Sequence, residues 1–276
     1  MPQQRTFKYS LAYWCLGLTE WNWDMDRICR TAKDLGIQSI ELVPPELLPT
    51  LKKHGLTSAL AGNGMPDPPF AKGVNNAKYH DQVIERTKHA IDECVEYGIP
   101  NVIAFTGYRW MNAEDPASGE ITRDQGIENS VKALKELAPY AEQNKTVICL
   151  EHLNSRDGSH PMKGHPGYQG DDLDFCVEIL RRVASPNVKL LFDIYHVQIM
   201  HGDVIRRMRL AADLIGHVHT AGNPGRRELD DHQEIHYPGV MRELKEIGYS
   251  GFVGHEFIPT RDPVEGLTEA IQRCEV

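Results

Sequence analysis

Carboxylates and an imidazole end a series of short apolar runs in the second half of the sequence. The runs are TVICL, VKLLF, IGHVHT and FVGHEF, each apolar enough for a buried strand. An ionised carboxylate beside such a strand is costly unless it is paired or bound to a cation. Oxygen-rich ligation with one histidine and no thiolate favours Mn(II) or Mg(II), and Co(II) or Zn(II) could replace them. We therefore predict one divalent metal site with the ligands Glu151, Asp193, His219 and Glu256.

These residues need a fold that gathers the ends of successive strands. Eight short apolar runs alternate with amphipathic helical stretches, as repeated βα units around a parallel sheet do. We predict an α/β fold, a single (β/α)8 TIM barrel forming one domain over residues 1–276, with the polar strand ends at its mouth. An open doubly wound sheet is the alternative, but no Gly-rich phosphate motif opens the first helix. The expected strands are 7–12, 37–43, 56–61, 101–106, 146–150, 188–193, 215–220 and 251–257.

Glycines and loops support the predicted alternation of strands and helices. Gly36, Gly98 and Gly248 each follow a helical stretch, where a left-handed cap is most easily formed. The longest irregular segments, 62–77 and 154–170, both follow strands and are expected on the active face of the barrel. Helices are expected between the strands, for example at residues 24–35, 78–97, 127–143, 171–183 and 240–247.

Composition excludes several classes of protein. The formal charge of -9 offers no basic surface for a nucleic acid or an acidic membrane. The six cysteines have no CxxC spacing and are interpreted as reduced core thiols. The start of the sequence lacks a charged region followed by an apolar one, and no apolar run is long enough for a membrane span. We expect a cytoplasmic protein with a small-molecule substrate and no nucleic-acid or membrane partner, and a homo-oligomer is compatible with the sequence.

Five segments, in order along the chain, resemble the xylose isomerase-like TIM barrel superfamily. Within it they look closest to the hydroxypyruvate isomerase family, with the ketose 3-epimerases as near relatives. The segments are SIEL (39–42), LEHLN (150–154), LLFDIYH (190–196), HVHTAGNPGR (217–226) and GHEFIP (254–259).

The resemblance implies roles for particular residues. It implies that the metal ligands are Glu151, Asp193, His219 and Glu256, and that Glu151 and Glu256 also form the acid/base pair. It places His196 and Arg226 on substrate oxygens and Glu41 in the pocket.

The chemistry of these residue types supports part of this assignment. A metal chelated by a carbonyl and the adjacent hydroxyl stabilises the enediolate formed when a carboxylate removes the neighbouring proton. Arg226 suits an anionic group of the substrate, although it could instead be a solvated surface arginine. Trp14 could form a wall of the substrate pocket or pack in the core.

Histidines near these motifs have more than one interpretation. His217 faces the same side of its strand as His219 and is interpreted as a satisfied interior histidine, with support of a metal ligand as the alternative. His196 could be a polar cap at the strand end. His160 and His165 could close over the substrate, but exposed loop histidines usually have no function.

The function predicted is a metal-dependent isomerase of a hydroxy-oxo acid or sugar that transfers protons through the enediolate. The same site could serve a ketose 3-epimerase, or a dehydratase or lyase if a β-hydroxyl is lost. A non-catalytic sugar-binding barrel is a further alternative, but it would have no need of two bases. A metal-dependent endonuclease is disfavoured by the acidic charge, and NAD chemistry has no motif.

Overall fold

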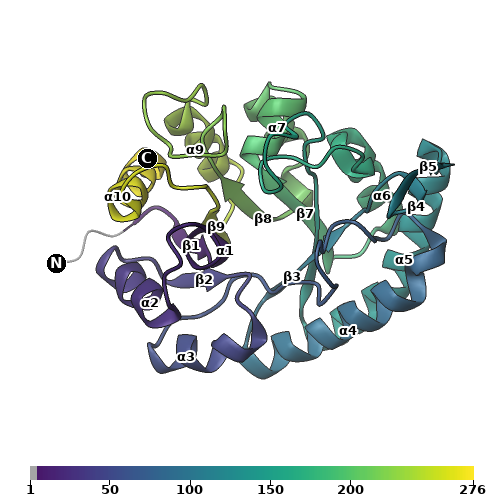
Figure 1. Cartoon of the computed structure of the whole chain (residues 1–276), viewed down its shortest axis with the longest axis horizontal. Coiled ribbons are helices and arrows are strands. Elements are labelled where there is room, and N and C mark those ends of the chain that lie inside the picture. Colours follow the sequence, from purple (N-terminus) through teal and green to yellow (C-terminus); the bar gives the residue numbers. More distant parts are fainter. Residues whose placement is uncertain (1–4) are drawn as a thin grey trace.

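The computed structural model describes residues 5–276, and its main feature is a curved parallel sheet surrounded by helices (Figure 1). The strand order is β2-β1-β9-β8-β7-β6-β3. Successive strands of this sheet pair with one another except β2 and β3, which form its two edges, and β1 also pairs with β9. The strands of this sheet are β1 (Lys8–Ala12), β2 (Ser39–Glu41), β3 (Asn101–Phe105), β6 (Val147–Glu151), β7 (Val188–Asp193), β8 (Ile215–Thr220) and β9 (Phe252–His255).

The eighth element of the barrel is the segment 57–61, which forms isolated bridges instead of a regular strand. Ser39 pairs with Thr57 on one side, and Ala61 pairs with Val102 on the other. The backbone N–H of Ala61 donates to Asn101 at 2.8 Å and its carbonyl accepts from Ile103 at 3.0 Å. The segment therefore closes the gap between β2 and β3, and the predicted TIM barrel is confirmed with its third strand reduced to bridges.

Helices cover the outside of the sheet in Figure 1. The predicted helices are present with shifted ends; the third begins four residues early because Thr122 and Gln125 form a capping box. Gly98 ends α4 in the left-handed conformation at φ 68°, as predicted. The helices are α1 (Trp14–Gly17), α2 (Met25–Asp34), α3 (Leu48–Lys53), α4 (His80–Tyr97), α5 (Arg123–Asn144), α6 (Leu173–Val183), α7 (Ile194–Met200), α8 (Val204–Leu210), α9 (Tyr237–Glu246) and α10 (Pro263–Cys274).

A two-stranded antiparallel hairpin, β4 (Trp110–Asn112) and β5 (Asp115–Glu120), interrupts the βα series after β3. The hairpin was not expected from the sequence. Its second strand reads DPASGE and is mostly exposed, so it carries none of the apolar alternation by which a strand is recognised.

Alternation along the strands separates two layers of side chains. Val102, Ala104, Ile148 and Leu150 pack in the large cluster with the helices. The alternate residues of β3, β6 and β7 belong to a smaller cluster inside the barrel, which includes Ile103, Phe105, Cys149 and Leu191. Because Glu151 and Asp193 stand two residues after Cys149 and Leu191, they share this interior face. The pleat thus directs the polar strand ends into the mouth of the barrel.

Candidate active site

The four predicted metal ligands meet at the carboxyl ends of β6, β7, β8 and β9. Asp193 pairs in register with His219, and the backbone N–H of Glu256 donates to Thr220 at 3.0 Å. One ligand atom from each of the four residues lies within 4.8 Å of all the others. All four side chains are buried. The structure therefore brings together the residues that the strand-end pattern had grouped: Glu151, Asp193, His219 and Glu256.

The donor atoms of this cluster fit a divalent cation. Nδ1 of His219 lies 2.9 Å from Glu256 Oε2 and 3.6 Å from Glu151 Oε1. Neither this Nδ1 nor Glu151 Oε1 has a hydrogen-bond partner among the described residues, although both are buried. Buried polar atoms without partners are costly unless something else satisfies them. Three carboxylates and one imidazole provide the hard oxygen and nitrogen donors that Mn(II), Mg(II) or Zn(II) accept.

The two glutamates of the cluster have different electrostatic surroundings. Burial is the main cause that raises the pKa of Glu151 to about 7, and the nearby charge of Glu256 adds to it. Burial would also raise the pKa of Glu256, but the charges of Arg226 and His219 outweigh it and lower that pKa to about 2. The metal-free site therefore holds one carboxyl group that takes a proton readily and one that stays ionised.

Arg226 lies at the edge of the cluster and contributes the main positive charge of the cavity wall. It is 2% exposed, and Nη1 donates to the Met162 carbonyl at 2.6 Å. Nη2 forms an ion pair with Glu256 and lies 3.5 Å from Asp193 Oδ2. Its Nε has no partner among the described residues. The predicted substrate-binding arginine is thus buried beside the metal ligands, not solvated on the surface.

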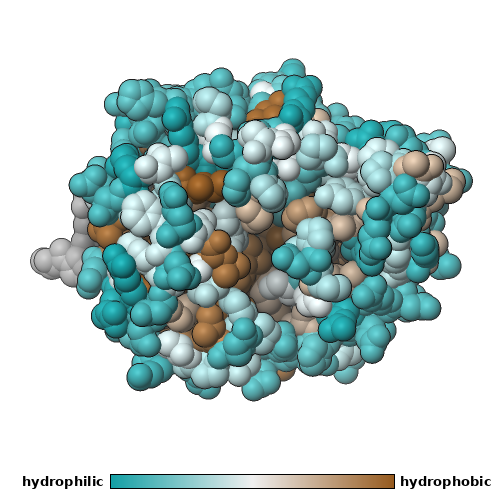
Figure 2. Space-filling model, in the orientation of Figure 1, coloured by the Kyte–Doolittle hydropathy of each residue, from teal (hydrophilic) through white to brown (hydrophobic). Residues whose placement is uncertain are grey.

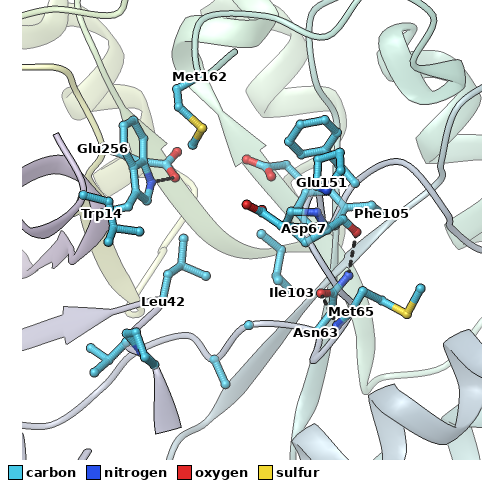
Figure 3. Close-up of a pocket in the computed structure, with 18 of the residues that line it drawn as sticks. Trp14, Leu42, Asn63, Met65, Asp67, Ile103, Phe105, Glu151, Met162 and Glu256 are labelled. Carbon is cyan, nitrogen blue, oxygen red and sulfur yellow. Dashed lines mark hydrogen bonds between the residues drawn. The ribbon is translucent and has the colours of Figure 1, made fainter. Parts of the chain in front are cut away.

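Trp14 lines the same cavity and contacts a predicted ligand directly. Its indole Nε1 donates to Glu256 Oε1 at 2.8 Å, and the Arg226 guanidinium carbon lies 5.2 Å from the ring centroid. Figure 3 shows Trp14 and Glu256 on one side of the cavity and Glu151 on the other. Trp14 therefore forms part of the wall and also fixes one carboxylate.

His196 and Glu41, predicted to contact substrate, lie behind the cavity wall. His196 is fully buried; its Nδ1 accepts from the Asn154 backbone N–H at 3.1 Å, and Nε2 lies 3.6 Å from Asp193 Oδ2. Glu41 is also fully buried and pairs with His217 and His219. Neither residue is among those that line the cavity. The buried carboxylate of Glu41 needs hydrogen-bond donors, and the histidine N–H groups across the barrel provide them.

The cavity itself has a volume of about 980 Å³ and opens at the centre of the face shown in Figure 2, where hydrophobic residues gather around the hollow. Both loops predicted for the active face, 62–77 and 154–170, contribute to its lining. His165, from the second loop, is 4% exposed and its ring centroid lies 4.0 Å from that of Phe70. Burial lowers the pKa of His165 to about 3, so it is neutral at physiological pH.

An apolar wall opposite the predicted metal ligands was not expected from the sequence. Leu42, Phe70, Ile103 and Phe105 all line the cavity. Ile103 and Phe105 occupy interior-facing positions of β3, and Phe105 pairs in register with Glu151 on the adjacent strand. The sequence did contain a signal for this wall, because Phe105 and Glu151 lie near the ends of neighbouring strands in the predicted barrel.

Comparison with known proteins agrees with the fold. A family model described as "Xylose isomerase-like TIM barrel" matches residues 29–275. A putative hydroxypyruvate isomerase from human is 36% identical over 185 residues, covering 66% of this chain and 63% of that protein, so the match spans less than two thirds of its length. A 2-oxo-tetronate isomerase from Cupriavidus necator is 30% identical over 251 residues, covering 88% and 90%.

The fold is shared with structures that are more distant in sequence. A solved L-ribulose 3-epimerase superposes with a TM-score of 0.73 at 19% identity, covering 96% of this chain and 92% of that one. No helix among residues 5–276 is long and apolar enough to span a membrane. The match over nearly the whole chain shows that this protein belongs to the xylose isomerase-like TIM barrel family, with homologues named hydroxypyruvate isomerase and 2-oxo-tetronate isomerase.

Proposed function

We propose that this chain is a divalent-metal-dependent isomerase that moves a carbonyl group between adjacent carbons of a small hydroxy-oxo acid. The observation that carries the proposal is the buried group Glu151, Asp193, His219 and Glu256 at one end of the barrel. A non-catalytic sugar-binding protein would gain nothing from two carboxylates held on opposite sides of one cavity (Figure 3).

The reaction requires removal of the proton from the hydroxyl-bearing carbon next to the carbonyl and its return to the former carbonyl carbon, while the hydroxyl proton passes to the former carbonyl oxygen. A bound Mn(II) or Mg(II) ion would supply Lewis-acid stabilisation of the negative charge that develops on the substrate oxygens. Glu151, Asp193, His219 and Glu256 would hold this ion.

Glu151 and Glu256 are the groups that would move the proton. Trp14 and Arg226 both donate to Glu256, so this carboxylate has a fixed orientation. Oε1 of Glu151 has no hydrogen-bond partner among the described residues and is available to accept or return a proton. A pair of carboxylates on opposite sides of a substrate can deprotonate one carbon and protonate its neighbour through the enediolate.

Arg226 supports an acid as the substrate. A guanidinium binds a carboxylate through parallel N–H groups, and this one is buried in the cavity wall with Nε unpartnered among the described residues. The names of the two sequence relatives also refer to small hydroxy-oxo acids. His196 would contact the substrate only after its side chain or the wall in front of it moved, because it is fully buried.

Ketose 3-epimerisation is the second candidate, and cavity size is the observation that favours it. A volume of about 980 Å³ is near the upper end of ordinary ligand pockets and leaves room beyond a three- or four-carbon acid. The same carboxylate pair could return the proton to the opposite face of one carbon instead of to its neighbour.

The test is deuterium incorporation followed by NMR in deuterated water with Mg(II). The panel is hydroxypyruvate, 2-oxo-tetronate, a ketopentose and a ketohexose, each with the wild type and Glu256→Gln. Glu228→Gln is the matched control, because Glu228 is equally buried but binds Thr260 and Arg261 away from the cluster.

We expect metal-dependent incorporation into one of the acids, lost in Glu256→Gln and kept in Glu228→Gln. Incorporation at C3 of the ketoses alone would replace the isomerase with the epimerase. Absence of exchange with every compound, in wild type that binds Mg(II), would contradict both candidates.

A further inference from the structure

We propose that Glu41 is a positioning residue that fixes His219 from behind and thereby directs Nδ1 of this histidine toward the carboxylates of the metal site. The inference rests on the proposed function, because it gives Glu41 a role relative to the metal. It differs from the pocket contact that the resemblance implied for this residue.

The hydrogen bonds of Glu41 define which ring nitrogen carries the proton. Oε1 of Glu41 lies 2.6 Å from His219 Nε2 and 3.1 Å from His217 Nε2. An ionised carboxylate only accepts, so each of these nitrogens donates. The proton held on Nε2 leaves Nδ1 as the nitrogen that would bind the ion, on the side where Glu256 Oε2 lies 2.9 Å away.

This arrangement is the one by which proteins commonly orient a metal-binding histidine. A ligating imidazole usually donates its second N–H to a carboxylate, which fixes the ring and makes the ligating nitrogen more basic. Here the residues come from two strands of the barrel: Glu41 ends β2, while His217 and His219 lie on β8. The contact therefore spans the barrel interior and cannot arise from local sequence.

Burial makes the contact rigid. Glu41, His217 and His219 are all fully buried, so water does not compete for their hydrogen bonds. A Cβ atom at Gly254 would lie 2.5 Å from Glu41 Oε1 and 2.8 Å from His219 Cδ2. The glycine on β9 thus leaves the space in which the carboxylate and the imidazole meet.

A second metal ion held by Glu41, His217 and His219 is the competing interpretation, because their donor atoms also lie within 4.8 Å of one another. Two adjacent ligands of an octahedral cation at about 2.1 Å lie about 3 Å apart, close to the 2.9 Å between His219 Nδ1 and Glu256 Oε2 in the proposed metal site. The 2.6 Å between Glu41 Oε1 and His219 Nε2 is shorter and fits a charge-assisted hydrogen bond.

The experiment is titration of the EDTA-treated full chain with Mn(II) by calorimetry, comparing wild type, Glu41→Gln and the control Glu228→Gln. The amide oxygen of Glu41→Gln could still accept from both ring N–H groups, but it carries no negative charge, so the charge-assisted hydrogen bond that makes His219 more basic is lost. We expect one ion per chain, an affinity about 10- to 100-fold weaker in Glu41→Gln, and an unchanged affinity in Glu228→Gln. Circular dichroism would check that each variant is folded.

Equal affinity in wild type and folded Glu41→Gln would overturn the inference while leaving the proposed function intact. Two ions in wild type and one in Glu41→Gln would overturn it in favour of the second metal site. Wild type that binds no Mn(II) would instead remove the proposed function, on which the inference depends.

If Glu41→Gln fails to fold, the wild type alone still decides the question. Nitrogen-15 NMR of the histidine rings in the Mg(II)-loaded protein reports the tautomer of His219. The inference requires a proton on Nε2 and none on Nδ1, and the opposite tautomer would contradict it.

Discussion

The two halves of the barrel mouth have the same backbone geometry and different side chains. Strands β6, β7 and β8 and the residue after β9 supply the metal-site cluster, whereas the ends of β1 and β3 supply Ala12 and Phe105. The boundary is sharp, because Phe105 pairs in register with Glu151 on the next strand. We propose from this comparison that one half performs the chemistry and the other half shapes the space for the substrate.

Removing either carboxylate of the polar half should have the largest effect. We expect Glu151→Gln or Glu256→Gln to lower kcat by about 10³-fold, because loss of a general acid or base typically costs 10²- to 10⁴-fold. Steady-state kinetics in saturating Mn(II) would measure this. Activity within tenfold of wild type in both variants would show that the acid/base pair lies elsewhere.

Substitution of the cavity arginine should distinguish acids from neutral sugars. We expect Arg226→Ala to lower kcat/KM for a hydroxy-oxo acid roughly 100-fold, since a hydrogen bond to a charged group contributes about 1.5–3 kcal/mol. Glu256 would also lose an ion-pair partner, so a ketose must serve as the reference substrate. An equal loss for the acid and the ketose would contradict binding of the substrate carboxylate by Arg226.

Acidification should destabilise the protein through His255, the buried histidine that precedes Glu256 of the polar half. Burial lowers the pKa of His255 from 6.5 to about 4, so between these values the unfolded chain binds more protons than the folded one. The corresponding stability is fully present above pH 6.5 and is lost as pH falls toward 4, by roughly 3 kcal/mol for 2.5 pKa units.

The measurement is urea unfolding of the EDTA-treated protein at pH 7 and pH 5. His255→Phe, which retains a ring against Tyr9, should show a smaller difference between the two pH values. An unchanged difference would mean that other groups dominate the acid response.

The smallest effect is expected in the apolar half. Phe105→Leu should reduce stability by about 1 kcal/mol and alter KM more than kcat, because this side chain lines the cavity and packs against Phe70 with ring centroids 6.2 Å apart. Denaturation and kinetics together would measure this. A kcat loss as large as that of Glu256→Gln would remove the functional distinction between the two halves.

The sequence was sufficient to predict the barrel and the grouping of the metal-site residues. Glu151 and Asp193 directly end apolar strands, and parallel strands place such residues at one edge. Glu41 also ends a strand, but its partners are histidines across the barrel, and nothing in the spacing of residues 41, 217 and 219 reveals a contact through the interior. The hairpin β4–β5 and the reduction of 57–61 to bridges depend on tertiary packing that apolar periodicity does not report.

The central claim is that the polar half of the mouth binds one catalytic metal. The most direct test is a crystal structure of the protein soaked in Mn(II), with anomalous diffraction used to locate the ion. The account predicts one Mn(II) ion bonded to Glu151, Asp193, His219 and Glu256. An ion bound elsewhere, or no ion at this cluster at a saturating concentration, would contradict it.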